Sequence, residues 1–342
     1  MSEESPGYSI SRAKNCIFLT TFLGILGLST IFLPTTFYKA NSVGTSSTIA
    51  MRKSNDEVIF DGKDVGKTAT KTFTNLSGRF FTREKRFPSC IIIGARKSGT
   101  RALLRFLDLH PKIRAYRGTE LHFFDNDTRY GFGLDWFLDK MPYSRPDQLT
   151  LTKTPAYFHS LSVPVRVYRF DPQIKLLLIV KDPVVRAVSD YTQLMMKALR
   201  RGKSFPPFEE KVLKQDGSIN VSSPIVAIGR YAQLLTRWLR YFSLRQIFIV
   251  DGDAFARDPY PELQKVEEFL GLPAKITRDQ LVYEPDKGFF CPVERNRVRC
   301  LGAGKGRRHP EVPEEVLQQL RHFYRHENEQ FCRLTGSELD WC

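Results

Sequence analysis

The sequence predicts an α/β fold in which a central parallel sheet is flanked by helices. Three short apolar runs, CIIIG at 90–94, IKLLLIV at 174–180 and QIFIV at 246–250, have the length of strands that are buried on both faces. Between these runs lie segments with the apolar period of amphipathic helices. Strands that alternate with helices are typical of a parallel sheet covered on both sides. A chain of 342 residues is long enough to bury a sizeable core.

The helices expected from this pattern adjoin the three strands. Proline is well tolerated in the first turn of a helix, and Pro183 begins the segment after the second strand. We expect helices at 100–109, 183–200, 231–242 and 261–272. We assign Trp136, Trp238 and Trp341 to core packing.

The first 85 residues differ from the rest of the chain. Residues 16–33, CIFLTTFLGILGLSTIFL, carry no charge and are long enough for a tilted membrane span. This run is longer than the apolar core of a typical signal peptide, and no clear A-x-A cleavage site follows it. We therefore predict a cytosolic tail at 1–15, an uncleaved signal anchor at 16–33 and a luminal stem at 34–85. Arg12 and Lys14 favour this orientation, whereas positive residues after the segment weaken it.

Two further patterns agree with a luminal location. Three N-x-[ST] sequons predict glycosylation at Asn75, Asn126 and Asn220. Cys291 and Cys300 lie in a polar segment where a tight disulfide loop is expected. A zinc site is the rival interpretation, but no C-x-x-C or nearby Cys/His pair supports it. The pairing of Cys332 and Cys342 is left open.

The net charge of +15 indicates polyanionic partners such as nucleic acid, anionic lipid, or sulfated and phosphorylated substrates. A solvated basic surface is the alternative.

The stretch IIIGARKSGTR at 91–101 closely resembles a P-loop. Gly94 and Gly99 have the spacing of G-x-x-x-x-G-K-[ST], but Lys97 lies inside the loop and no lysine follows Gly99. A turn between strand and helix offers N–H groups and the positive end of the helix dipole to phosphate or sulfate oxygens. Thr100 can cap the helix or donate its hydroxyl. The missing lysine, with no acidic strand end for magnesium, argues against an ATPase or nucleotide switch.

A second anion position is suggested by LIVKDPVVRAVSDYTQ at 178–193. Lys181 ends a strand and Ser189 follows two turns into the next helix, so the two would converge on a further phosphate. Together with the first loop this makes a two-phosphate nucleotide site. An ordinary exposed serine and a basic turn without a ligand are the alternatives.

Several blocks along the chain resemble one family. In order they are GARKSGTRALLRFLDLHP, ELHFFD, LTKTPAYF, KDPVVRAVSDYTQ, VDGDAF, KGFFC and KGRRHPEV. The last three quarters of the chain is similar to the sulfotransferase domain of heparan sulfate glucosamine 3-O-sulfotransferases, especially the short isoform one and five type. The resemblance implies a P-loop-like sulfotransferase fold at 86–342. It also implies a single-pass type II Golgi membrane protein whose luminal domain moves sulfate from 3′-phosphoadenylyl sulfate (PAPS) to the glucosamine 3-hydroxyl of heparan sulfate.

The resemblance further implies how PAPS would bind. The loop around the 5′-phosphosulfate would comprise Arg96, Lys97, Ser98, Gly99, Thr100 and Arg101, with Lys97 near the bridging oxygen. Lys181 and Ser189 would bind the 3′-phosphate, and the Cys291–Cys300 disulfide would stabilise a segment that closes over the nucleotide. That segment would contribute Phe290, Lys305, Gly306, Arg307, Arg308 and His309. Neither a metal nor a nucleic-acid partner is expected.

The acceptor side is implied in the same way. Glu120 aligns with the family's catalytic base. Such a base is required because a sugar hydroxyl is a poor nucleophile unless a carboxylate takes its proton. Lys97, Lys153 and His122 would stabilise charge on the sulfuryl and leaving groups. The acceptor site would comprise Arg96, Arg101, Glu120, His122, Phe123, Asp125, Lys153, Thr154, Pro155 and Ala156. A capping acid at 120 and a core histidine at 122 are the alternatives.

Four positions depart from the family's usual residues. The family usually has Gly at Ser98, Arg at Lys181, Glu at Thr152 and often Tyr at Phe290. Serine reduces backbone freedom at 98 if that position needs a positive φ, and lysine lacks the bidentate fork of arginine at 181. A catalytically weak heparan sulfate-binding protein and a carbohydrate sulfotransferase of other positional specificity are therefore the alternative functions.

Overall fold

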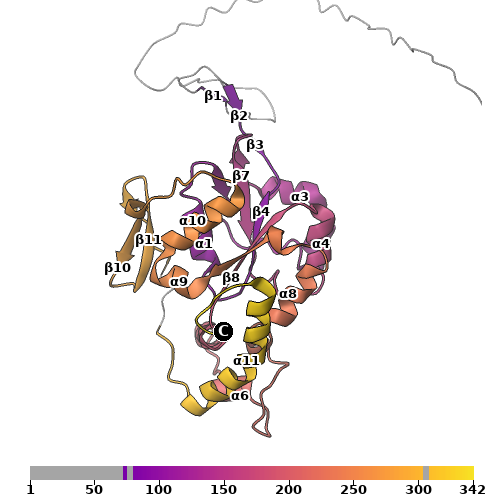
Figure 1. Ribbon diagram of the computed structural model, residues 1–342, viewed down its shortest axis with the longest axis vertical. Coiled ribbons are helices and arrows are strands. Elements are labelled where there is room, and N and C mark those ends of the chain that lie inside the picture. Colours follow the sequence, from indigo (N-terminus) through magenta and orange to yellow (C-terminus); the bar gives the residue numbers. More distant parts are fainter. Residues whose placement is uncertain (1–71, 75–79, 303–307) are drawn as a thin grey trace, which may run out of the picture. The chain divides into compact units, whose positions relative to one another are not determined.

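A five-stranded parallel sheet, in the order β5-β7-β4-β8-β9, lies at the centre of the described part of residues 86–342 (Figure 1). The strands are β4 (Cys90–Gly94), β5 (Ile113–Ala115), β7 (Leu149–Lys153), β8 (Lys175–Val180) and β9 (Ile247–Asp251). The three predicted strands are confirmed as β4, β8 and β9, within a residue at each end. The chain passes from β4 outward to β5, returns to β7, and then crosses to β8 and β9. Because strand order reverses at β4, ligands are expected at its carboxyl end.

The structure is a computed structural model that describes residues 72–74, 80–302 and 308–342. The predicted tail, the signal anchor and most of the stem lie outside these residues. Asn75, Lys305, Gly306 and Arg307 also lie outside them. Among the described helices, none has the length and apolar character that a membrane span requires.

Helices cover both faces of the sheet, as predicted. One face is covered by α1 (Thr100–Leu107), α9 (Gly252–Arg257) and α10 (Pro259–Leu270), and the other by α4 (Val163–Phe170) and α8 (Tyr231–Leu239) (Figure 1). The remaining α-helices of the described chain are α2 (Asp127–Gly131), α3 (Gly133–Lys140), α5 (Pro183–Leu199), α6 (Phe208–Val212), α7 (Pro224–Ala227) and α11 (Glu314–Thr335). The short 3-10 helices η1 (Leu244–Gln246) and η2 (Arg278–Gln280) precede β9 and β10.

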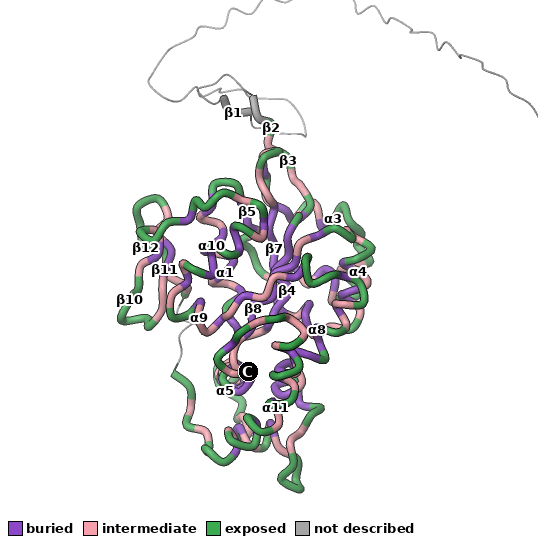
Figure 2. The backbone as a smooth tube through the Cα atoms, in the orientation of Figure 1, coloured by how far each residue is buried: buried purple, intermediate pink, exposed green. Residues whose placement is uncertain are grey.

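The core explains why β4 is an uninterrupted apolar run. Strand β4 is buried along its whole length (Figure 2). Ile91 and Ile93 pack in one cluster with the fully buried Trp238 of α8, whereas Ile92 packs with Leu103 of α1 in another. Alternate residues of a strand point to opposite faces, so both faces of β4 must be apolar. Trp238 is a core residue as predicted, while Trp136 and Trp341 are partly buried at the edge of the first cluster. Helices α5, α6, α7 and α11 share a third cluster.

Small antiparallel sheets lie outside the parallel sheet. Their strands are β1 (Thr72–Thr74) with β2 (Phe80–Thr82), β3 (Glu84–Lys85) with β6 (Tyr143–Ser144), and β10 (Leu281–Glu284) with β11 (Phe289–Glu294) and β12 (Arg297–Val298). A disulfide joins Cys291 in β11 to Cys300 beyond β12, in agreement with the expected pairing. A second disulfide joins Cys332 to Cys342, which the sequence left open.

Candidate functional site

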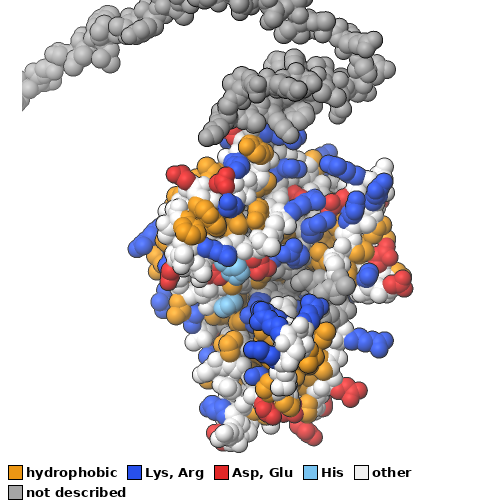
Figure 3. All heavy atoms as spheres, turned by 180° about the vertical axis from the view of Figure 1, so that it is seen from behind, with side chains coloured by type: hydrophobic (Ala, Val, Ile, Leu, Met, Phe, Trp, Pro, Cys, Tyr) orange, Lys and Arg blue, Asp and Glu red, His pale blue; other side chains and the backbone are white. Residues whose placement is uncertain are grey.

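A cleft of about 590 Å³ lies beyond the carboxyl ends of β4 and β7. It receives residues from the loop after β4, the segment around residue 120, the end of β7, and α5. Of the predicted site residues it brings together Arg96, Lys97, Gly99, Thr100, Arg101, Glu120, His122, Lys153, Pro155, Ala156, Ser189 and His309. On the face shown in Figure 3, Lys and Arg side chains surround a central region that also exposes His and acidic side chains.

The loop between β4 and α1 is shaped by its two glycines. A Cβ atom at Gly94 would lie 2.5 Å from Cβ of Phe158, so only glycine lets the strand pass this side chain. The N–H of Ala95 donates to the Ile179 carbonyl oxygen at 2.7 Å and ties the loop to β8. Gly99, with φ of +110°, provides no side-chain cap for α1. The first N–H groups of α1 therefore suit an anionic ligand.

Ser98 has no backbone strain of the kind considered above, because its φ angle is not positive. The positive φ angles of this loop belong to Lys97, at +77°, and to Gly99. Ser98 is 1% exposed and does not line the cleft. The serine is thus compatible with the loop, and the left-handed conformation at Lys97 is the one that a non-glycine residue adopts here.

One turn of α5 contacts both the loop and the late segment. The Nε and Nη2 atoms of Arg96 donate to Oδ2 of Asp190 at 3.1 and 2.5 Å. The Lys97 ammonium donates to the Gln193 amide oxygen at 2.9 Å. The Thr192 hydroxyl lies 2.9 Å from Nδ1 of His309 and donates to the Val188 carbonyl oxygen. Since that hydroxyl has one hydrogen, Nδ1 of His309 must be the donor in the other contact.

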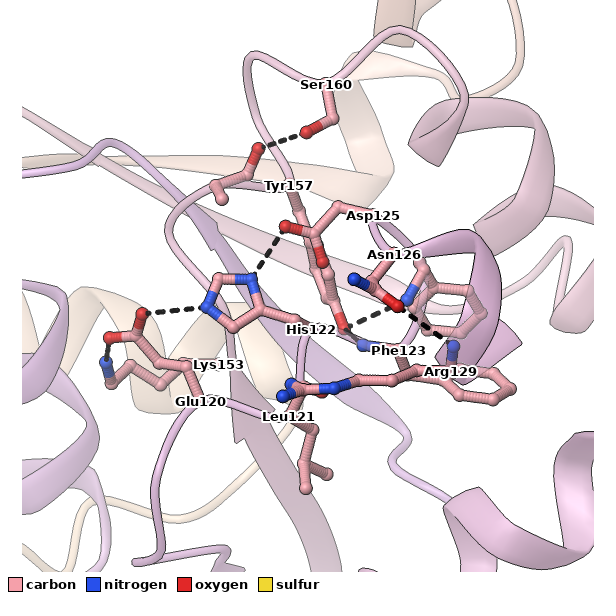
Figure 4. A network of polar contacts seen from close by, with 12 residues as sticks. Glu120, Leu121, His122, Phe123, Asp125, Asn126, Arg129, Lys153, Tyr157 and Ser160 are labelled. Atoms are coloured by element: carbon pink, nitrogen blue, oxygen red, sulfur yellow. Dashed lines mark hydrogen bonds and ion pairs between the residues drawn. The ribbon is translucent and has the colours of Figure 1, made fainter. Parts of the chain in front are cut away.

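A chain of charged groups runs through Lys153, Glu120, His122 and Asp125 (Figure 4). The Lys153 ammonium, 4% exposed at the end of β7, donates to Oε1 of Glu120. The other oxygen of Glu120 lies 3.6 Å from Nε2 of His122. On the far side of the imidazole ring, Nδ1 of His122 donates to Oδ2 of Asp125 at 2.8 Å. Both oxygens of Glu120 thus face a cationic or polar neighbour.

The charge state of His122 follows from these contacts. The hydrogen bond to Asp125 raises the pKa of His122 above its ordinary value of 6.5, burial opposes this, and the negative charges of Asp125 and Glu120 add to the rise. The imidazolium form therefore persists to higher pH than in an isolated histidine. At the other end of the cleft, burial and the nearby Lys97 and Lys181 lower the pKa of His309.

Several predicted site residues lie away from the surface of the cleft. Phe123 and Thr154 are buried, and Asp125 reaches the cleft only through His122. The Lys181 ammonium lies 3.4 Å from Oδ1 of Asp253. Phe290 packs against Tyr283 in the β10–β11 hairpin. Of the late block, Arg308 is exposed and does not line the cleft.

The cleft also contains residues that sequence reasoning missed: Ala102, Thr192, Gln193, Lys197 and Leu301. Two of them could have been predicted from the sequence. Gln193 and Lys197 follow Ser189 at intervals of four residues, which places all three on one face of a helix. Thr152, at the position where the family it resembles usually has Glu, is buried in β7, and Lys153 has Glu120 as a carboxylate partner.

The predicted modification sites differ in their local structure. Asn126 is exposed and caps α2, its side-chain oxygen accepting from the N–H of Arg129. The side-chain oxygen of Asn220, which is half-buried, accepts from the N–H of Ser222. In both cases the side-chain nitrogen, to which a glycan would be attached, makes none of these bonds.

Among the described residues no group of three or more His, Cys, Asp or Glu is placed to bind a metal ion.

Comparisons with known proteins agree with this architecture. The family described as "Sulfotransferase domain" matches residues 87–332. The chain is 43% identical over 260 residues to human (Homo sapiens) heparan sulfate glucosamine 3-O-sulfotransferase 5, covering 75% of each chain. It is also 43% identical over 262 residues to human 3-O-sulfotransferase 3B1, covering 75% of this chain and 65% of that one. A sulfotransferase from Alicyclobacillus acidocaldarius has the same fold, with a TM-score of 0.55 and 22% identity over 75% of this chain and 99% of its own. The chain therefore belongs to the sulfotransferase-domain family and, within it, to the heparan sulfate glucosamine 3-O-sulfotransferases.

Proposed function

We propose that this protein transfers a sulfuryl group from PAPS to the 3-hydroxyl of glucosamine residues in heparan sulfate. Family membership supports the reaction and its substrates. The structural observation that carries the proposal is that Glu120 and the anion-binding loop after β4 face one cleft. A base and a donor site must share a cleft for a direct displacement, because the hydroxyl and the sulfur have to meet.

The donor side uses groups that suit two separate phosphates. The loop around Lys97 and the start of α1 receives the 5′-phosphosulfate, and Lys97 neutralises charge on the bridging oxygen. Ser189, which lines the cleft, binds the 3′-phosphate, and Lys181, which lies outside the cleft lining beside Asp253, adds positive charge near it. His309, at the described end of the late block, lies beside the same cations. The residues present thus fit a nucleotide with anionic groups at both its 5′ and 3′ positions.

On the acceptor side Glu120 is the general base. Its carboxylate takes the proton of the sugar 3-hydroxyl while that oxygen forms a bond to sulfur. The bond between sulfur and the bridging oxygen breaks, and its electron pair leaves on the 5′-phosphate. Lys153 and His122 orient the Glu120 carboxylate through its two oxygens and add positive charge beside the transferring group. Arg96 and Arg101 meet the sulfates and carboxylates of the polysaccharide.

The reaction can be tested directly with the full-length chain in detergent. Heparan sulfate is incubated with PAPS carrying labelled sulfate, and the labelled position is mapped on the digested product. We expect the label at glucosamine O-3. An acceptor already sulfated at every glucosamine O-3 is the control and should take up none. Label at N- or 6-O-positions would indicate another sulfotransferase, and binding without transfer would indicate a heparan sulfate-binding protein.

We further propose that the enzyme is a single-pass type II protein of the Golgi membrane with its catalytic domain in the lumen. The charge-free segment 16–33 and the sequons at Asn126 and Asn220 support this orientation. In sealed Golgi vesicles the catalytic domain should resist added protease, and a glycosidase specific for N-glycans should reduce its mass. Digestion of the domain in intact vesicles would contradict the orientation.

The pH dependence of the reaction should report on His122. We expect the cationic form to be the active one, so kcat/KM should fall as pH rises through the raised pKa of His122. Asp125→Asn removes the charged acceptor that raises this pKa, so the alkaline limb of the profile should move to lower pH.

Asp127→Asn is the matched control, because that carboxylate lies two residues away and pairs with Arg166 instead. Its profile should match that of the wild type. An alkaline limb that stays in place in Asp125→Asn would contradict the assignment of this limb to His122.

A further inference from the structure

The side chain of the loop residue Arg96 is held by the buried carboxylate of Asp190 on α5. The Asp190 side chain is 0% exposed, whereas that of Arg96 is 31% exposed and lines the cleft. Both Nε and Nη2 of Arg96 donate to the same Asp190 oxygen, Oδ2. These residues are 94 positions apart in the sequence, so their contact joins the loop after β4 to the third turn of α5.

This contact divides the Arg96 guanidinium into two edges. A guanidinium has five N–H donors, one on Nε and two on each terminal nitrogen. Asp190 accepts from Nε and from one N–H of Nη2, so the edge that includes Nη1 is the part of Arg96 left to bind a ligand in the cleft. Arginine is suited to such double duty because its donors are held in a rigid planar fork. A lysine ammonium is a compact point charge and has no separate edge that could face a ligand while another faces Asp190.

A second cation shares the same carboxylate. Arg186, 0% exposed, donates from Nη1 to Oδ2 of Asp190 at 3.2 Å and from Nη2 to the Ile225 carbonyl oxygen. His159 lies near this group, and burial, followed by the charge of Arg96, lowers its pKa to about 4, so the ring is neutral at physiological pH. Two guanidinium groups and one carboxylate leave a net positive charge under the loop. This charge favours an anionic ligand at the exposed edge of Arg96.

We propose that Asp190 is a positioning residue for sulfate transfer: it fixes Arg96 so that the free guanidinium edge meets the anionic acceptor. Asp190 touches neither substrate and acts through Arg96. The inference rests on the proposed function, since it takes heparan sulfate as the ligand. A long, partly exposed arginine that lines the cleft would otherwise lose rotamer freedom when the polysaccharide binds. Because Asp190 already holds Arg96 in the folded protein, this loss of side-chain freedom occurs on folding and no longer weakens the binding of heparan sulfate.

The test is a double-mutant cycle on heparan sulfate affinity, measured by calorimetry without PAPS, and on the KM for heparan sulfate. The variants are Asp190→Asn, Arg96→Ala and the combination. Asp190→Asn alone should weaken both quantities by up to about tenfold, the usual scale for ordering one long side chain. In the Arg96→Ala background it should have no further effect, because the residue through which it acts is gone. A purely structural role would instead give equal effects in both backgrounds and would overturn the proposal.

Glu327→Gln is the matched control, because Glu327 is a half-buried carboxylate that accepts from Nε of Arg230 at 3.0 Å outside the cleft. It should leave heparan sulfate affinity unchanged. If Asp190→Asn does not fold, the same cycle is built on Asp190→Glu, which keeps a negative charge in the buried site and shifts the oxygen that Arg96 and Arg186 share. A wild-type chain that binds heparan sulfate without sulfating it would overturn the proposed function alone, since the binding cycle would still decide the role of Asp190.

Discussion

Replacing Glu120 by glutamine should lower the rate of sulfate transfer by about 10²–10⁴-fold, the range that a positioned general base contributes. The amide keeps the size of the carboxylate, and its oxygen can still accept from Lys153, so the local fold should persist. An amide cannot take the proton of the sugar hydroxyl, however. The measurement is kcat with labelled PAPS and heparan sulfate, together with PAPS affinity by calorimetry, which should stay near the wild-type value.

The control for this variant is Glu210→Gln, an exposed acid on α6 away from the cleft, which should transfer sulfate at the wild-type rate. Wild-type kcat in Glu120→Gln would rule out Glu120 as the base and would direct attention to another acceptor of the proton in the same cleft.

Replacing Lys97 by methionine should lower kcat by about 10²–10³-fold, as is typical when a donor to developing negative charge is removed. The bridging oxygen of PAPS becomes a phosphate oxygen as sulfur departs, and the Lys97 ammonium is the loop cation assigned to it. In the structure this ammonium donates to the amide oxygen of Gln193 on α5, and Lys97 has a left-handed backbone conformation. The effect should be on kcat with saturating PAPS, because the charge it stabilises increases in the transition state.

Lys197→Met provides a close comparison. Lys197 lines the same cleft one turn further along α5 than Gln193, and we expect its ammonium to meet the polysaccharide. This variant should raise the KM for heparan sulfate and leave kcat nearly unchanged. Equal losses of kcat in the two variants would show that the cleft responds to total charge, and would remove the special role of Lys97.

The parts of the fold that the sequence predicted are those with local signals. The runs at β4 and β8 are continuous and apolar because these strands are buried on both faces, and the half-buried edge strand β9 packs against both clusters, so all three are recognisable. Strand β5 has three residues, IRA, and β7 reads LTLTK, so neither has an apolar run long enough to identify. Their place in the sheet depends on long-range pairing, which no local pattern encodes.

The same distinction applies to the site. The loop 94–101 and Glu120 lie in recognisable motifs, so they could be predicted as site residues from the sequence. Asp190, Thr192 and Gln193 lie in the block KDPVVRAVSDYTQ, but sequence reasoning assigns a role only to Lys181 and Ser189 of that block. Their roles come from partners about one hundred residues away, such as Arg96 and His309, and only the folded chain brings these together.

The pairing of β4 with β7 has a consequence for how this enzyme's specificity can change. Backbone register places Lys153 beside Ile92, so the loop that receives the donor and the lysine that orients the base are mounted on adjacent strands of one rigid sheet. Glu120, His122 and Asp125 instead lie on the connection that leaves the edge strand β5. The segment that carries Glu120 is thus attached to the edge of the sheet, whereas the loop after β4, whose Arg96 and Arg101 we also assign to the polysaccharide, lies near its centre. A new sugar preference can arise by substitution within residues 116–126 while the frame that handles PAPS stays intact.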